Sequence, residues 1–380
     1  MRIVFVISQL SNGGAERMMA AYANALAQMG EEVHVVSICD DENDYVLDSR
    51  IIKDHWLVQS SKVNIPKVRG LCNIWNSVMQ IRRLSGDIII PFCMPVEYYM
   101  RLVFATLFSK TRLLYAVRCD PERDIPSERI RRKRDIVSRF ADGIWIQTEE
   151  QRRYFPRYLQ RRIFEVHNIL DEHFLNVPRT NRERIRSFIS VGRLHPQKNH
   201  KMLIEAFVKM IRRTDIQDAT LTIYGKARAD YQETEEELKA LILREHMEDR
   251  IFLPGRTADI EAEYERADAF VFGSDYEGCP NALMEAMAAG LPCVSTDCPT
   301  GPSMLIESGK NGILVPVGDA DAMSRAMEWL IRNPRTAYEM GMAAKQRMRT
   351  WESSGELAEQ LLRNLRKICW GCGKRYESMH

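Results

Sequence analysis

The chain has 380 residues, of which 45% are hydrophobic and 28% charged, and its net charge is +2. These values are typical of a soluble globular protein, and the length predicts two domains because a single core rarely serves so many residues. No uncharged apolar run approaches the roughly 20 residues that a membrane span needs, and the apolar part of residues 1–7 is too short for a signal peptide.

Strands and helices alternate through the first half of the chain. A glycine-containing loop follows the first apolar run and leads into a predicted helix at 15–28, which Gly30 ends. Alternation of this kind predicts an α/β fold with a parallel, doubly wound sheet. The runs of strand length lie at residues 3–7, 33–38, 88–91, 113–117 and 143–147.

A second series of strands and helices begins near residue 188. A strand enters a glycine loop there, and a predicted helix follows at 201–212. The polar stretch 171–186 separates the two series, so we expect domains at 1–175 and 185–350, followed by a last helix near 356–369. The further strands of this series are expected at 220–224, 251–253, 269–272, 293–296 and 313–317.

Positive charge is concentrated between residues 101 and 165. This region holds sixteen Lys/Arg against nine Asp/Glu, a balance of +7, so the rest of the chain carries −5. A solvated helix face, attraction to anionic lipid and attraction to nucleic acid are the open interpretations. Nucleic acid is disfavoured because the overall charge is small and no nucleic-acid motif is present. The densest run contains Arg129, Arg131, Arg132, Lys133 and Arg134.

Two glutamates eight positions apart follow the strand expected at 269–272. Glu277 lies in the loop after this strand, and Glu285 lies on a helix expected at 282–289. Loops at the carboxyl ends of parallel strands are where ligands bind in such sheets. Residues 277–285 resemble the E-x7-E motif of the retaining glycosyltransferases of family 4, which have the fold called GT-B. The resemblance implies two Rossmann-like domains facing each other across a cleft, with the segment 356–380 packing back on the N-terminal domain.

A pair of cations stands on the loop that follows the strand near residue 188. The negative charge of a diphosphate leaving group grows as its glycosidic bond breaks, and Arg193 and Lys198 are suited to stabilise it. Their place about eighty residues before the glutamates resembles the diphosphate clamp of the family. The resemblance implies catalytic roles for Glu277, Arg193 and Lys198, with Glu277 beside the donor sugar and Glu285 on the nucleotide ribose.

The same resemblance implies a wider set of donor contacts, including the loop before the helix at 15–28. Two local departures stand out: Ala227 replaces a glycine that the family often has, and Met304 stands where many members have glutamate. The donor-binding residues implied are Gly13, Gly14, Gly192, Arg193, Lys198, Gly225, Arg256, Gly278, Asn281, Ala282, Leu283 and Glu285.

Acceptor contacts are expected in the N-terminal domain. Glu16 and Arg17 belong to a G-G-A-E-R loop that resembles the family's acceptor-side loop, and Arg118 and Asp120 end the strand at 113–117. For Arg118 and Asp120, an ordinary turn stopped by Asp-Pro is the alternative interpretation.

We expect neither a metal nor a cofactor, because the two cations supply the charge that a divalent ion supplies elsewhere. No D-x-D motif opens a donor loop, and Asp40 and Asp41 lack the strand-end context. Nine scattered cysteines favour reduced thiols in a cytosol. Cys369 and Cys372 have the spacing of a metal or redox pair, but no second pair lies near them.

The sequence therefore predicts a retaining glycosyltransferase, a hexosyl- or N-acetylhexosaminyltransferase. It would move a sugar from a nucleotide-sugar, with UDP-sugar favoured, to a glycan or lipid-linked acceptor in bacterial polysaccharide or glycan biosynthesis. The alternatives are a sugar-nucleotide epimerase on the same fold, a basic-patch nucleic-acid-binding protein and a non-catalytic sugar binder. We expect a cytoplasmic protein, and peripheral attachment to an anionic membrane face through the basic run is one open interpretation.

Overall fold

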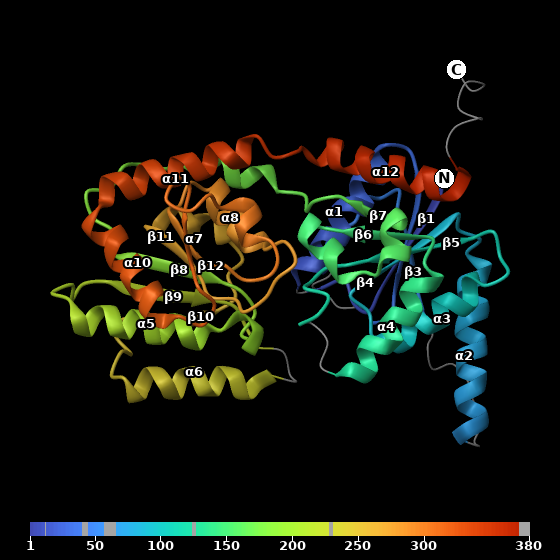
Figure 1. Ribbon diagram of the computed structural model, residues 1–380, viewed down its shortest axis with the longest axis horizontal. Coiled ribbons are helices and arrows are strands. Elements are labelled where there is room, and N and C mark those ends of the chain that lie inside the picture. Colours follow the sequence, from blue (N-terminus) through green and yellow to red (C-terminus); the bar gives the residue numbers. More distant parts are fainter. Residues whose placement is uncertain (12, 40–44, 57–65, 124–126, 228–230, 372–380) are drawn as a thin grey trace. The chain divides into compact units, whose positions relative to one another are not determined.

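The computed structural model describes residues 1–380 except 12, 40–44, 57–65, 124–126, 228–230 and 372–380. The chain forms two compact units (Figure 1). The N-terminal unit comprises Met1–Ile169 and the chain from Glu352 onward, and the C-terminal unit comprises Leu170–Trp351. The segment that we expected to be the linker therefore begins the C-terminal unit.

The N-terminal unit is built on a parallel sheet of seven strands in the order β3-β2-β1-β4-β5-β6-β7. Its first strand, β1 (Arg2–Ile7), is almost completely buried, which explains its continuous apolar run, since helices cover both faces of a parallel sheet. The strands are β1 (Arg2–Ile7), β2 (Glu32–Ser37), β3 (Ile52–His55), β4 (Ile88–Phe92), β5 (Arg112–Ala116), β6 (Gly143–Ile146) and β7 (Ile163–Glu165).

Five α-helices belong to the described part of this unit, and the last of them comes from the end of the chain. A capping box of Ser353 and Glu356 starts this last helix, and Arg366 donates to Glu31 at 2.7 Å. The apolar stripe Leu357, Leu361 and Leu365 is fully buried, so packing holds the helix on the N-terminal unit. The helices are α1 (Gly14–Gln28), α2 (Pro66–Arg83), α3 (Val96–Thr106), α4 (Glu128–Phe140) and α12 (Ser354–Trp370).

The C-terminal unit repeats this plan with a parallel sheet of six strands in the order β10-β9-β8-β11-β12-β13. Both sheets reverse their order beside their first strand, as Rossmann-like sheets do. The prediction of two doubly wound parallel sheets is therefore confirmed. The strands are β8 (Ser187–Val191), β9 (Thr220–Tyr224), β10 (Ile251–Gly255), β11 (Ala269–Phe272), β12 (Cys293–Thr296) and β13 (Ile313–Val315).

Helices cover both faces of the C-terminal sheet, with α5 and α6 on one side and α8 and α11 on the other (Figure 1). The core on the α5 side joins this helix to α10 and to the strands through fully buried side chains such as Phe207 and Met327. The helices are α5 (His200–Arg213), α6 (Gln232–Arg244), α7 (Ile260–Arg266), α8 (Asn281–Ala288), α9 (Pro302–Leu305), α10 (Ala320–Arg332) and α11 (Pro334–Arg349).

Candidate active site

The point where the C-terminal sheet reverses its strand order brings two charged residues into contact. Strands β8 and β11 are neighbours there, and the loops that leave their carboxyl ends carry Lys198 and Glu277. Lys198 Nζ lies 2.5 Å from Glu277 Oε1, although 79 positions separate the two residues in the chain. Such a switch point is the usual ligand site of an open α/β sheet. The structure thus unites the two residues that the sequence assigned to the leaving group and to the sugar.

The ion pair is largely but not completely buried. The side chains of Lys198 and Glu277 are 17% and 9% exposed, and the ammonium also lies 5.5 Å from the centre of the Phe272 ring. In such a low-dielectric place a charge interacts more strongly with its neighbours than it does in water. A diphosphate that entered here would therefore compete with Glu277 for the ammonium.

The loop after β12 fixes the backbone of Glu277. The Thr300 hydroxyl donates to the carbonyl oxygens of Glu277 at 3.0 Å and Gly278 at 3.1 Å. The Glu277 amide donates to Pro299 O at 2.8 Å. Gly301, with φ of 101°, approaches Gly278 so closely that a Cβ there would lie 2.6 Å from the Gly278 oxygen. Thr300 is fully buried, and its role was not predicted from the sequence.

One glycine stands at the carboxyl end of each of the neighbouring strands β8, β9 and β10. The Gly192 amide donates to Tyr224 O at 2.9 Å, and the Gly225 amide donates to Gly255 O at 2.8 Å. A Cβ on Gly225 would overlap the Gly192 carbonyl, so only glycine fits there. Arg193 directly follows Gly192 in the chain, and Arg256 directly follows Gly255 and is exposed. Two expected donor cations thus lie at the same edge of the sheet as Lys198.

Helix α8 carries the remaining expected donor contacts. Glu285 is buried, and the hydroxyl of fully buried Tyr264 on α7 donates to its Oε2 at 3.4 Å. Asn281 and Ala282, in the first turn of α8, are half-buried. The Leu283 side chain is fully buried in the core, so only its backbone is available to a donor.

A buried histidine supports the loop that carries Arg193. His200 begins α5, and its Nε2 lies 3.1 Å from the Arg193 carbonyl oxygen, the geometry of an N–H donated to that oxygen. Burial lowers the pKa of His200 to about 4, and the charge of Lys198 acts in the same direction. The imidazole is therefore neutral at pH 7. The role of His200 was not predicted from the sequence.

This low pKa predicts that the folded protein becomes less stable in acid. An unfolded histidine titrates near 6.5, so the unfolded chain binds a proton between pH 6.5 and about 4 that the native imidazole does not. Stability is therefore lost as the pH falls through this window, by about 2 kcal/mol at pH 5 relative to pH 8. Urea unfolding at both pH values should show a smaller acid loss in His200→Gln. An equal loss in both proteins would contradict the prediction.

In the N-terminal unit, the expected first loop leads into α1. Gly13 is the N-cap, and the Glu16 side chain folds back over it, into the space that a Cβ on Gly13 would occupy. A carboxylate in the first turn is favoured by the helix dipole. The Tyr45 hydroxyl donates to Gly13 O at 3.2 Å, which fixes the backbone of this loop. Gly14 is exposed and Arg17 is half-buried.

Arg118 and Asp120 have different surroundings. The Arg118 guanidinium lies over the rings of Trp145 at 3.7 Å and Phe92 at 4.4 Å, at the carboxyl ends of β6 and β4. Asp120 is fully buried and accepts from the amides of Glu122 and Arg123 and from the Tyr154 hydroxyl. The structure thus gives Asp120 the turn-holding role that the sequence left open as an alternative.

Comparisons with known proteins identify the chemistry. Residues 176–347 match the model of the family described as glycosyl transferases group 1. An uncharacterized glycosyltransferase of Haemophilus influenzae is 24% identical over 88% of this chain and 92% of its own. A Campylobacter jejuni enzyme is 22% identical over 97% of this chain and 99% of its own; it is named GalNAc-α-(1→4)-GalNAc-α-(1→3)-diNAcBac-PP-undecaprenol α-1,4-N-acetyl-D-galactosaminyltransferase.

The protein is a glycosyltransferase. The crystal structure of Anabaena HepE in complex with UDP superposes on this glycosyltransferase with a TM-score of 0.79, 19% identity, and coverage of 97% of this chain and 100% of the other. This likeness shows the fold, and the prediction of a GT-B fold is confirmed.

The basic run of the glycosyltransferase lies on α4, and one prediction about it is wrong. Arg134 is buried, donates to Pro121 O and pairs with Asp135 at 2.8 Å, so it is unavailable to a membrane. Its spacing from Val137, which is fully buried on the same face, explains this. Lys133 pairs with Glu97 at 2.9 Å, and Arg132 pairs with Glu128 at 2.8 Å. Arg129, Arg131 and Arg132 are exposed.

The described residues of the glycosyltransferase contain no group of three or more His, Cys, Asp or Glu placed to hold a metal. Cys369 is half-buried, and burial raises the pKa of its thiol to about 12. Its expected partner Cys372, together with Asp40 and Asp41, lies outside the described residues. In the described ranges, no helix is long and apolar enough to cross a membrane.

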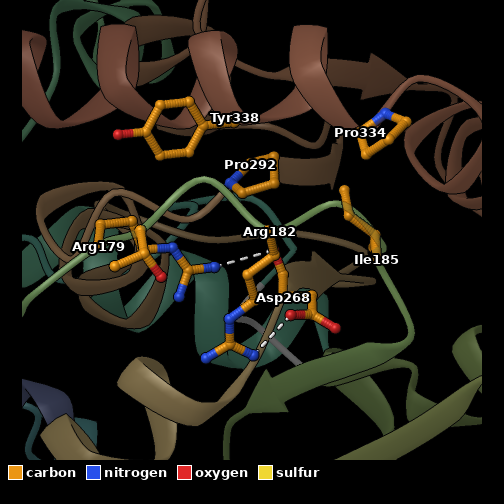
Figure 2. Close-up of a pocket in the computed structure, with 8 residues that line it drawn as sticks. Arg179, Arg182, Ile185, Asp268, Pro292, Pro334 and Tyr338 are labelled. Carbon is orange, nitrogen blue, oxygen red and sulfur yellow. Dashed lines mark hydrogen bonds and ion pairs between the residues drawn. The ribbon is translucent and has the colours of Figure 1, made fainter.

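A small pocket lies at the opposite, amino-terminal edge of the C-terminal sheet, where two arginines line it (Figure 2). Arg179 donates to the carbonyl oxygens of Tyr264 and Asp268, and Arg182 donates to Arg266 O and Asp268 Oδ1. The Tyr264 and Arg266 carbonyls lie in the last turn of α7, where cations are favoured. Burial lowers the pKa of Arg179 to about 10, which leaves it charged. The arginines therefore anchor the start of the C-terminal unit.

Proposed function

We propose that this glycosyltransferase moves a sugar with retention of configuration from a UDP-sugar to a glycan or lipid-linked saccharide. The observation that carries the proposal is the Lys198–Glu277 pair at the switch point of the C-terminal sheet. Its support comes from the E-x7-E resemblance to family 4, from the UDP bound to HepE and from the diphospho-undecaprenol glycan in the Campylobacter enzyme's name. The setting that we propose is bacterial polysaccharide or glycan biosynthesis.

In this proposal the C-terminal unit binds the donor. Arg193 and Lys198 stabilise the diphosphate as its charge grows, which lowers the barrier more than it strengthens ground-state binding. When the diphosphate draws the Lys198 ammonium toward itself, Glu277 becomes available to the sugar hydroxyls and to the positive charge at the anomeric carbon. We propose that these cations make a divalent metal unnecessary, and that Arg118 and the loop at Glu16 and Arg17 contact the acceptor.

A donor panel tests the function. Purified protein is incubated with UDP-, GDP- and ADP-sugars, first in thermal-shift assays and then with diphospholipid-linked saccharides as acceptors. A true donor raises the melting temperature by mass action. The transferred sugar should keep its anomeric configuration by NMR, and turnover should survive EDTA. Donor conversion without any acceptor would instead indicate an epimerase, and an inverted anomer would exclude the retaining mechanism.

Removing Glu285 should weaken donor binding. A buried carboxylate accepts hydrogen bonds from both ribose hydroxyls in this proposal, and bonds to a charged group contribute about 1.5–3 kcal/mol. Calorimetry of UDP should therefore show Glu285→Gln binding roughly 10- to 100-fold more weakly. The matched control, Tyr264→Phe, removes only the hydroxyl that donates to Glu285 and should have a smaller effect. Unchanged UDP affinity in Glu285→Gln would refute the ribose assignment.

We also propose peripheral attachment to an anionic membrane through α4. Arg129 and Arg132 lie on the same face of this helix as Ile136 and Phe140, both exposed apolar side chains. Cations near an anionic surface contribute about 1 kcal/mol each, and apolar side chains between them add buried area. A face of this composition is suited to a charged lipid surface.

Vesicle co-sedimentation tests this attachment. The triple variant R129Q/R131Q/R132Q should bind phosphatidylglycerol vesicles roughly 100-fold more weakly than the unaltered protein, since three cations are lost. The control K201Q/R244Q/R335Q removes the same charge from exposed positions of the C-terminal unit and should bind normally. Binding should also fall with salt. Equal loss in both variants would mean that net charge, not α4, attracts the vesicles.

A further inference from the structure

The two loops that carry the ion pair are joined by hydrogen bonds between the residues on either side of Lys198 and the two residues before Glu277. The Gln197 amide group donates to Tyr276 O at 2.7 Å, and the Asp275 amide donates to Gln197 O at 2.9 Å. Gln197 is buried, so these bonds are shielded from water. Each loop therefore holds the other immediately beside Lys198 or Glu277.

Asn199 makes the most specific of these cross-loop contacts. Its Nδ2 donates to Asp275 Oδ1 at 2.8 Å, while its Oδ1 accepts from the Met202 amide at 3.2 Å and caps α5. The residue has φ of 46°, a left-handed conformation that asparagine and aspartate tolerate better than most residues. One side chain thus fixes the start of α5, the loop after β11 and the backbone next to Lys198.

We propose that Asn199 and Asp275 form a positioning pair that aims the Lys198 ammonium at the terminal phosphate of the donor nucleotide. A backbone held on both sides of Lys198 places its Nζ within a narrow range, and a displacement of about 1 Å costs much of such an interaction. This inference rests on the proposed role of Lys198 in binding the diphosphate. The competing interpretation is a structural turn with no influence on the phosphate.

Calorimetry with UDP and UMP separates these interpretations, because UMP lacks the terminal phosphate. The variants are N199D, D275N and the exchange N199D/D275N. A carboxylate at 199 still caps α5 but cannot donate to Asp275, whereas the exchange restores one donor and one acceptor at unchanged net charge. Each single variant should reduce the UDP-to-UMP affinity ratio about tenfold, the loss expected for one hydrogen bond to a charged group, and leave UMP affinity unchanged. The exchange should return the ratio to within about threefold of the original.

Three results would overturn the positioning pair: an unchanged ratio in both single variants, an equal loss of UDP and UMP affinity, or no recovery in the exchange. A failure of the underlying function looks different. The unaltered protein would then bind UDP no better than UMP, which would remove the role of Lys198 and this inference with it. Circular dichroism of each variant confirms that α5 and its neighbours are folded.

Discussion

Replacing Lys198 with methionine is expected to lower kcat by roughly 10²- to 10³-fold with the donor that the panel identifies, the usual effect of losing one preorganised charge stabiliser. In the proposed mechanism the charge that Lys198 meets grows in the transition state, so KM should change much less than kcat. The variant also leaves Glu277 buried without the ammonium that it contacts at 2.5 Å. Steady-state kinetics on the donor provide the measurement. Lys201→Met, an exposed lysine on α5, is the matched control and should retain full activity.

The partner of Lys198 gives a second check on the same prediction. Residues that act as one unit lose activity non-additively, so K198M/E277Q should be little worse than the poorer single variant. Strict additivity would mean that the pair seen in the structure does not act together in catalysis. A higher KM with an unchanged kcat in Lys198→Met would show that the lysine binds substrate and transition state equally.

The elements that sequence patterns located best were those whose burial is continuous. Helices expected at 15–28 and 201–212 differ by a single residue at some ends from α1 and α5. The edge strand β3 was not predicted, because Ile52–His55 is mostly exposed and contains no apolar run typical of a strand. Strand β7 has only three residues, too few for any period. Short or exposed strands are specified by their neighbours, which a local pattern does not contain.

The candidate site was predictable in its parts but not in its pairing. Strand-end positions for Lys198 and Glu277 follow from the sequence, whereas their contact depends on β8 and β11 being neighbours although they are not consecutive strands. Asn199 had a usable signal, since asparagine directly before a helix favours an N-cap. Arg134 had one too, because Ile130, Arg134 and Val137 recur at the spacing of one helix face. Counting cations without that spacing placed it wrongly on the surface.

Replacing Asp268 with alanine should destabilise the C-terminal unit by about 2–4 kcal/mol. The buried Asp268 carboxylate accepts from the amides of Arg186 at 2.8 Å and Ser187 at 2.9 Å, and from Arg182 at 2.7 Å. Two of these donors are backbone groups at the start of β8, and leaving a buried donor unsatisfied costs about 1–3 kcal/mol. The Arg182 pair adds less because its guanidinium is 41% exposed and screened by solvent.

Hydrogen exchange in the full chain measures this loss locally, which avoids assuming that two units unfold as one. Peptides covering β8 and β11 should exchange roughly 30- to 1,000-fold faster in Asp268→Ala, while peptides from the N-terminal sheet should not change. Asp218→Ala is the matched control, since Asp218 also pairs with an arginine of this segment, Arg186 at 2.5 Å, but is exposed. Such surface pairs contribute at most about 1 kcal/mol. Equal acceleration in both variants would mean that Asp268 acts only as another surface ion pair, not as the buried anchor of β8.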